Sequence, residues 1–108
     1  MMKVDTSTLT DIINQCFDFS MDGRLSPQQR TVFLADGKRL RGLLINLLSA
    51  QFDEGNQAVL DANDRLAKVN SRLAASAAAL ANVAQTLGDV ATLVGNLDKL
   101  LNVAVSFL

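Results

Sequence analysis

A leucine-rich series with seven-residue spacing runs through the C-terminal half of the chain. Its members are Leu66, Leu73, Leu80, Leu87, Val94, Leu101 and Leu108, with Val59 one step earlier. A second series follows three residues after each of these and consists of Val69, Ser76, Val83, Val90, Leu97 and Ala104. Apolar residues at alternating steps of three and four form one face of an α-helix. The two series therefore predict a long helix over about 57–108 that packs against other helices.

Composition agrees with a helical fold. Of the 108 residues, 49% are hydrophobic, which is enough for one folded domain spanning 1–108. One Pro and six Gly leave long stretches without a helix breaker, so the predicted fold class is all-α. The formal net charge of −1 does not favour general attraction to nucleic acids or anionic membranes.

Two shorter helices are predicted before the long one. Apolar residues recur at helical spacing over 7–19. Ser26-Pro27-Gln28-Gln29 combines a capping box with Pro at the first helical position, and it predicts a second helix over about 27–53. For residues 31–41 the alternative is a β-hairpin that turns at Asp36-Gly37. The capping box before this segment and the apolar run after it favour the helix.

Three main helices of these lengths leave three architectures open. A helix of about 50 residues spans ~75 Å, which is close to the first two helices laid end to end. The chain could form an extended helical hairpin with a broken first arm. It could instead bend the long helix near Gly88 and fold into a compact bundle. In the third arrangement the C-terminal half is uncovered and pairs with another subunit.

Small residues form a stripe beside the heptad seam. The stripe consists of Ala67, Asn70, Ala74, Ala77, Ala81, Ala84, Gly88, Ala91 and Gly95. Small side chains let a neighbouring helix approach closely. The C-terminal helix thus presents two packing surfaces. Either both are filled inside the monomer, or at least one accepts another chain.

Toward the C-terminus the apolar face widens, and after Arg72 only Asp89, Asp98 and Lys99 are charged. Such a surface requires burial by the first predicted helix, a second subunit, a partner or lipid. The predicted partner-binding residues are Leu87, Val90, Leu93, Val94, Leu97, Leu100, Leu101 and Phe107. The predicted function is a non-catalytic protein–protein interaction module: an oligomerising scaffold, an adaptor, or a chaperone or inhibitor of a larger partner.

The sequence offers little for catalysis. It contains no His and no Tyr, and its single Cys16 lies on an apolar helical face, which favours a buried inert thiol. We find no glycine-rich phosphate loop and no cluster of metal ligands, so we predict no catalytic, cofactor-binding or metal-binding residues and no small-molecule substrate. The one aromatic residue among the basic residues from Arg24 to Arg41 is Phe33, which falls on the predicted apolar face of the helix and not among the charges. We therefore interpret the basic residues as a solvated helix face rather than a nucleic-acid site.

A membrane-active protein that inserts residues 73–108 is the alternative function. This segment is low in charge, but it has polar residues along one side, including Gln85 and Asn96, and it lacks the cationic flank of interfacial helices. No stretch reaches 18 consecutive apolar residues, and the N-terminus lacks the apolar core of a signal peptide. The expected location is therefore the cytoplasm.

Overall fold

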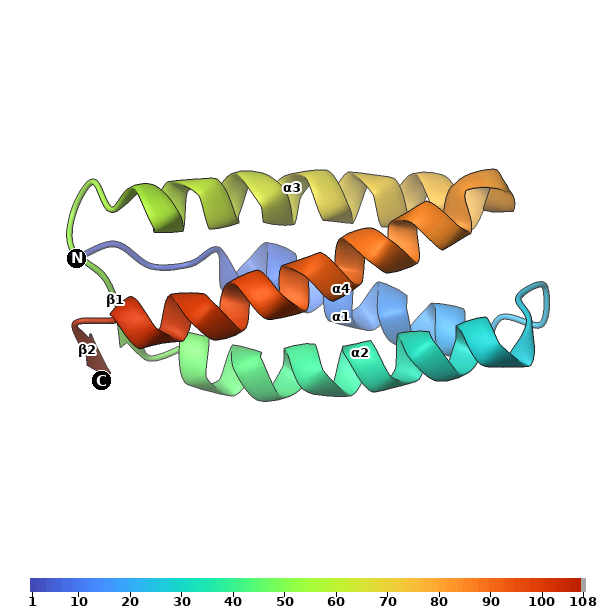
Figure 1. Cartoon of the computed structure of the whole chain (residues 1–108), viewed down its shortest axis with the longest axis horizontal. Helices are drawn as coiled ribbons and strands as arrows, with labels where there is room; N and C mark the ends of the chain where they lie inside the picture. The colour runs from blue at the N-terminus through green and yellow to red at the C-terminus, as the bar shows by residue number, and fades with distance from the viewer. Residues whose placement is uncertain (108) are drawn as a thin grey trace.

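The computed structural model describes residues 1–107, which form four α-helices packed side by side (Figure 1). The helices are α1 (Thr6–Ser20), α2 (Pro27–Leu47), α3 (Gln57–Ala78) and α4 (Val83–Leu100), and the 3-10 turns η1 (Leu80–Asn82) and η2 (Leu101–Val103) flank α4. Two short strands, β1 (Ala50–Gln51) and β2 (Ser106–Phe107), pair antiparallel. The bundle measures 42 × 20 × 18 Å. The predicted all-α class is confirmed.

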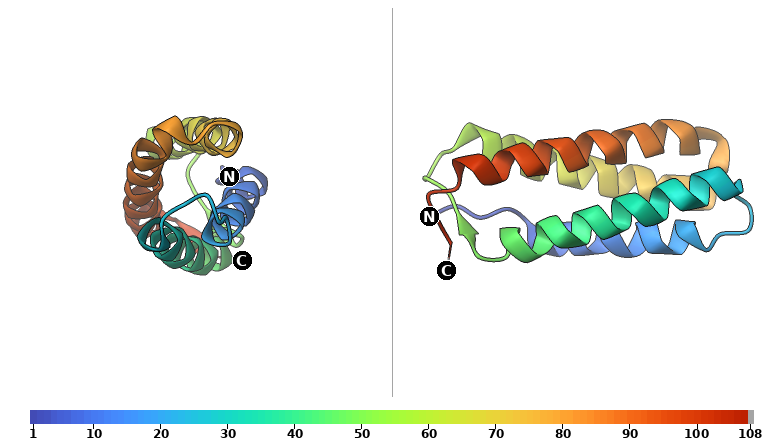
Figure 2. Two further views of the ribbon diagram at one scale, coloured as in Figure 1. Left: turned by 90° about the vertical axis from the view of Figure 1, so that its right-hand side faces the viewer. Right: turned by 60° about the horizontal axis from the view of Figure 1, so that its bottom comes forward.

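The order of the helices around the bundle differs from their order along the chain. α1 packs mainly on α2 and α3, and α4 packs mainly on the same two helices, so α1 and α4 lie diagonally opposite (Figure 2). Each helix runs opposite to the one before it, so α1 and α3 are parallel neighbours. α2 and α3 are also diagonally opposite, so the connection between them passes across the end of the bundle (Figure 2).

The predicted helix starts are confirmed for α2 and α3. The Ser26 hydroxyl accepts a hydrogen bond from the backbone N–H of Gln29 at 3.1 Å, and the Gln29 side chain accepts one from the backbone N–H of Ser26 at 3.1 Å. Before α3, Gly55 adopts a positive φ of 74°, and the Asn56 side chain accepts from the N–H groups of the first turn. Residues 31–41 lie inside α2, so the helix rather than the hairpin is confirmed.

One prediction was wrong: residues 57–108 do not form a single helix, and the chain does not bend near Gly88. It reverses at Ala79, whose backbone is extended (φ −146°, ψ 113°), while Gly88 lies inside α4. A 50-residue helix would reach ~75 Å, far beyond the 21-residue α2 that covers it. Folding back lets both halves bury their apolar faces in one core. That burial outweighs the helical preference of the Ala-rich segment. Leu108, the last member of the heptad series, lies outside the described residues.

The reversal at Ala79 also changes which positions of the seven-residue pattern face the core. In α3 both predicted series are buried, as shown by Leu66, Val69 and Leu73. In α4 the second series is buried, but Leu87 of the first series is only half-buried. The position before it, Thr86, faces the core instead. The seven-residue spacing therefore continues along the sequence, whereas the buried face shifts by about one residue from α3 to α4.

α2 ends at Leu47, six residues before the predicted end at 53. Ala50 and Phe52 are both fully buried. Residues two apart point to different sides of a helix but to the same side of an extended chain, so only the extended form buries both. The backbone of Phe52 exchanges hydrogen bonds of 2.8 and 2.9 Å with Met2, and the N–H of Val105 donates to the carbonyl of Gln51 at 2.8 Å. The segment thus ties together the two ends of the described chain.

Candidate interaction surface

The residues predicted to bind a partner do not form an exposed face. Five of them are buried in the core, namely Val90, Leu93, Val94, Leu97 and Leu100. Leu87 and Leu101 are half-buried against that core, and only Phe107 is exposed. Because α4 packs against α2 and α3, the chain itself supplies the burial that this surface requires. The pattern of apolar residues along a sequence is the same whether those residues are buried by the same chain or by a partner.

The segment considered for membrane insertion is also part of the bundle. Residues 73–107 form the end of α3, the whole of α4 and β2, and the large apolar residues of these helices face inward. Within the described residues, no helix combines the length and the apolar character needed to cross a bilayer.

The stripe of small residues lies on the outside. On α4, Ala84, Gly88, Ala91 and Gly95 are exposed, and a Cβ built at either glycine would meet no atom within 4 Å. On α3 the stripe runs beside α1, where Asn70 accepts a hydrogen bond from Gln15. The α4 part is a smooth surface without a large side chain that could anchor a partner.

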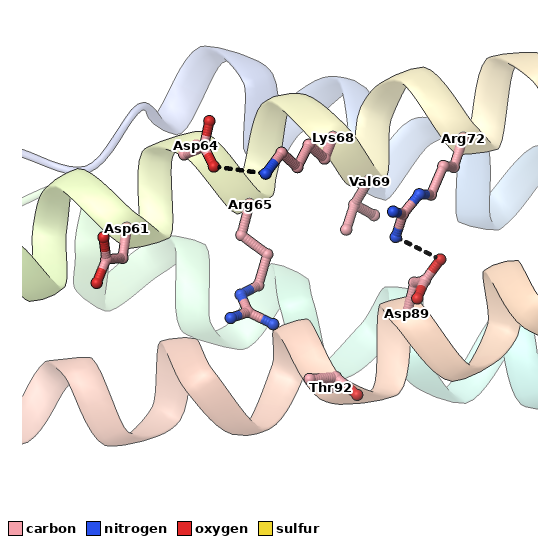
Figure 3. Close-up of a pocket in the computed structure, with 8 residues that line it drawn as sticks. All are labelled: Asp61, Asp64, Arg65, Lys68, Val69, Arg72, Asp89 and Thr92. Carbon is pink, nitrogen blue, oxygen red and sulfur yellow. Dashed lines mark hydrogen bonds and ion pairs between the residues drawn. The ribbon is translucent and has the colours of Figure 1, made fainter.

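A groove follows the junction of α3 and α4 (Figure 3). Its central hollow, of about 350 Å³, is lined by Asp61, Asp64, Arg65, Lys68, Val69, Arg72, Asp89 and Thr92. Several of these charges are neutralised within the chain: Lys68 pairs with Asp64 at 2.9 Å, and Arg72 pairs with Asp89 at 2.9 Å across the two helices. Asp61 accepts a hydrogen bond from Gln57 at 2.8 Å. The groove therefore has little net charge with which to select a ligand.

The groups with the most potential to bind a metal ion or act as a nucleophile are the acidic side chains and Cys16. No group of three or more His, Cys, Asp or Glu side chains is placed to hold a metal ion in the described part of the chain. The Cys16 thiol is fully buried, and burial, reinforced by the nearby Asp36, raises its pKa to about 12. A thiol with this pKa stays protonated at neutral pH and is a poor nucleophile.

Asp36 is the single buried charged side chain among the described residues. It lies on the inner side of α2 with 8% of its surface exposed, and its Oδ2 atom has no hydrogen-bond partner. Burial raises the pKa of this carboxyl, and the nearby Arg39 opposes that shift. An unpaired carboxylate in this position destabilises the bundle when it is ionised.

Asp36→Asn is expected to stabilise the protein at neutral pH. Because the pKa of Asp36 in the folded state lies above its ordinary value of 3.8, protonation favours the folded state. This stabilising contribution is complete below 3.8 and is lost as the pH rises through the folded-state pKa. The advantage of the variant should therefore shrink as the pH falls toward 3.8. Urea denaturation of both proteins across a pH series measures the difference between their free energies of unfolding. A variant less stable than the original at neutral pH would contradict the prediction.

Large hydrophobic side chains that stay exposed gather at one end of the bundle. Of the ten in the described residues, seven lie there: Met1, Ile45, Leu48, Leu60, Val103, Val105 and Phe107. This end, hereafter the terminal end, contains both ends of the described chain, the last turn of α2, the first turn of α3 and the β1–β2 pair (left side of Figure 1). Of the other three, Met21 lies at the opposite end, and Val32 and Leu34 lie in the N-terminal half of α2. Of these seven, only Phe107 is among the partner-binding residues predicted from the sequence. Val103 and Val105 flank the apolar face that the sequence indicated, and the segments that carry the other four reach the same end of the bundle only through the fold.

Comparison with models of known protein families, with curated proteins and with solved structures finds no match for this chain. The molecule is therefore classified by its own structure. It is an all-α four-helix bundle with a closed core and an apolar terminal end.

Proposed function

We propose that this chain is a non-catalytic protein–protein interaction module that binds its partner through the terminal end. The observation that carries the proposal is the concentration of seven exposed large hydrophobic side chains at one end of the bundle. Exposed apolar residues scattered singly are ordinary, whereas a gathered set is typical of an interaction surface. The adaptor, oligomerising scaffold, and chaperone or inhibitor roles all fit such a surface.

Local structure supports this proposal because it holds the terminal end in place. The amino group of Met1 pairs with Glu54 at 2.7 Å, and the Lys3 ammonium donates to the carbonyl of Leu48 at 3.0 Å. With the β1–β2 pairing, these contacts order the segments that carry the exposed side chains. A surface ordered before binding loses less conformational entropy when a partner docks.

The proposed location is the cytoplasm. Cys16 is a free thiol in the structure, and a single unpaired cysteine suits a reducing compartment.

The proposal is tested with the paired substitutions Val105→Ser and Phe107→Ser, which remove apolar surface from the terminal end. A matched control carries Ala84→Ser and Ala91→Ser on the exposed outer face of α4. We expect the unmodified protein to self-associate in light scattering or to retain a partner during purification from its native host. The terminal-end variant should lose that association and the control should keep it, with circular dichroism showing both folded. Equal association of all three proteins would refute the proposal.

A further inference from the structure

Five residues of α2 and its C-cap form an exposed line on the outside of the bundle, hereafter the α2 stripe. They are Leu34, Lys38, Arg41, Ile45 and Leu48, separated by steps of four and three residues, which places them on one helix face. The apolar members are 39%, 67% and 53% exposed in chain order. Ile45 and Leu48 also belong to the terminal end, so the α2 stripe continues that surface along the bundle.

Positive charge predominates on α2, although Arg39 acts on the carboxyl of Asp36 and Arg30 on that of Asp22. The helix carries Arg30, Lys38, Arg39 and Arg41, and none of them forms an ion pair within the described residues. Its only acid, Asp36, points inward and is buried. The α3–α4 groove differs in this respect, since two of its basic side chains have acidic partners. The outer face of α2 is therefore the part of the bundle that can best attract an acidic partner.

Arg41 is also held in position. Its guanidinium carbon lies 5.6 Å from the centroid of the Phe17 ring of α1, which is a cation–π contact. This contact holds a positive charge over the Phe17 ring, at the edge of the α2 stripe that borders α1.

We propose that the α2 stripe binds an acidic amphipathic helix of a partner protein. Leu34, Ile45 and Leu48 would contact the apolar face of that helix, and Lys38 and Arg41 would contact its carboxylates. From Leu34 to Leu48 the stripe spans 15 residues, or ~21 Å, which matches about four turns of a docked helix. The inference rests on the proposed function and supplies the chemistry of the partner.

Surrounding charges favour a helix over an anionic membrane. A bilayer would contact a wide area at the terminal end that includes the exposed acids Asp53 and Glu54. The Met1 amino group pairs with Glu54, but Asp53 would repel anionic lipids. The chain has no Trp and no Tyr, the residues that usually anchor proteins at a membrane interface. A single helix can lie on the stripe and avoid both acids.

The test uses a synthetic fluorescent helical peptide of about 18 residues, with Leu on one face and Glu on both flanks, and a second peptide with every Glu replaced by Lys. We expect fluorescence anisotropy to show binding of the Glu peptide only, weakened as the salt concentration rises from about 0.05 to about 0.5 M. Lys38→Glu with Arg41→Glu should weaken this binding by at least about tenfold. The control Arg65→Glu with Lys99→Glu makes the same change in net charge on α3 and α4 and should bind like the original.

Three results would overturn the inference: no binding of the Glu peptide, equal binding of both peptides, or equal weakening by the control. Co-sedimentation with vesicles of phosphatidylserine and phosphatidylcholine is measured alongside, and binding to vesicles but not to the Glu peptide would identify a membrane surface instead. The purification experiment with Val105→Ser and Phe107→Ser separates the two proposals. If association depends on the terminal end while the Glu peptide does not bind, the interaction module stands and the acidic-helix partner falls.

Discussion

Leu97→Asp is expected to unfold the protein, whereas Leu101→Asp, four residues later, should leave it folded. Leu97 is fully buried in α4, and Leu101 is half-buried in η2. Truncation of a buried leucine alone costs about 2–5 kcal/mol, and a carboxylate in its place adds the cost of burying a charge. Since a domain of this size is stable by about 5–15 kcal/mol, the total loss approaches the whole stability of the fold.

Circular dichroism with urea denaturation measures this difference, and size-exclusion chromatography with light scattering reports the state of association. The comparison separates the two interpretations of α4. If α4 were an exposed partner-binding face, Leu97→Asp would dissociate an assembly and leave a folded monomer. If it is the core helix of a closed bundle, the variant loses its cooperative unfolding transition. A folded Leu97→Asp monomer with an unchanged urea midpoint would contradict the described packing.

Gly37→Ala should destabilise the bundle, while Gly42→Ala, five residues later in α2, should stabilise it. At Gly37 a Cβ atom would lie 2.9 Å from the Cε1 atom of Phe17 and 3.3 Å from the Cβ of Cys16, so α1 and α2 would have to separate or Phe17 would have to move. Overpacking of this kind costs about 1–3 kcal/mol, which outweighs the gain of about 1 kcal/mol in helix propensity over most of that range. At Gly42 a Cβ would meet nothing within 4 Å, so the higher helix propensity of Ala contributes about 1 kcal/mol without a clash.

Thermal and urea denaturation of the two variants test this pair, because the same chemical change is made in the same helix. We expect their melting temperatures to move in opposite directions from that of the original protein. A Gly37→Ala protein as stable as Gly42→Ala would show that α1 and α2 do not approach closely at this point. Leu at Gly37 should have a larger effect than Ala, because it adds three more carbon atoms at the same contact.

Local signals in the sequence were sufficient where the structure depends on local chemistry. The capping box at Ser26 determines where α2 begins, since its two hydrogen bonds join residues three apart. Asn56 caps α3 in the same way. The heptad series located the inward face of α3, because the period of an apolar pattern follows directly from helix geometry. The inertness expected for Cys16 followed from its place on an apolar face, and the structure buries that thiol.

Elsewhere, contacts between distant parts of the chain override the local preferences of the sequence. Nothing at Ala79 marks a reversal, because the surrounding alanines favour a helix on both sides. Phe52 leaves the predicted helix because it buries its ring by pairing with Met2, fifty residues earlier in the chain. The candidate partner face is largely buried for the same reason: the apolar residues of α4 are covered by α2 and α3, and a sequence pattern does not state which surface covers another.

By itself, the sequence determined that the chain is helical, where two of its helices begin and which residues of α3 point inward, because these properties depend on residues within a few turns of each other. The tertiary structure alone decided that the C-terminal half folds back at Ala79, that α4 closes the core, and that seven exposed apolar residues lie at the terminal end. The physical reason is that burial of apolar surface is a property of the whole molecule. Residues 57–107 do not form one continuous helix, because α3 and α4 side by side bury more apolar surface than a single long helix can.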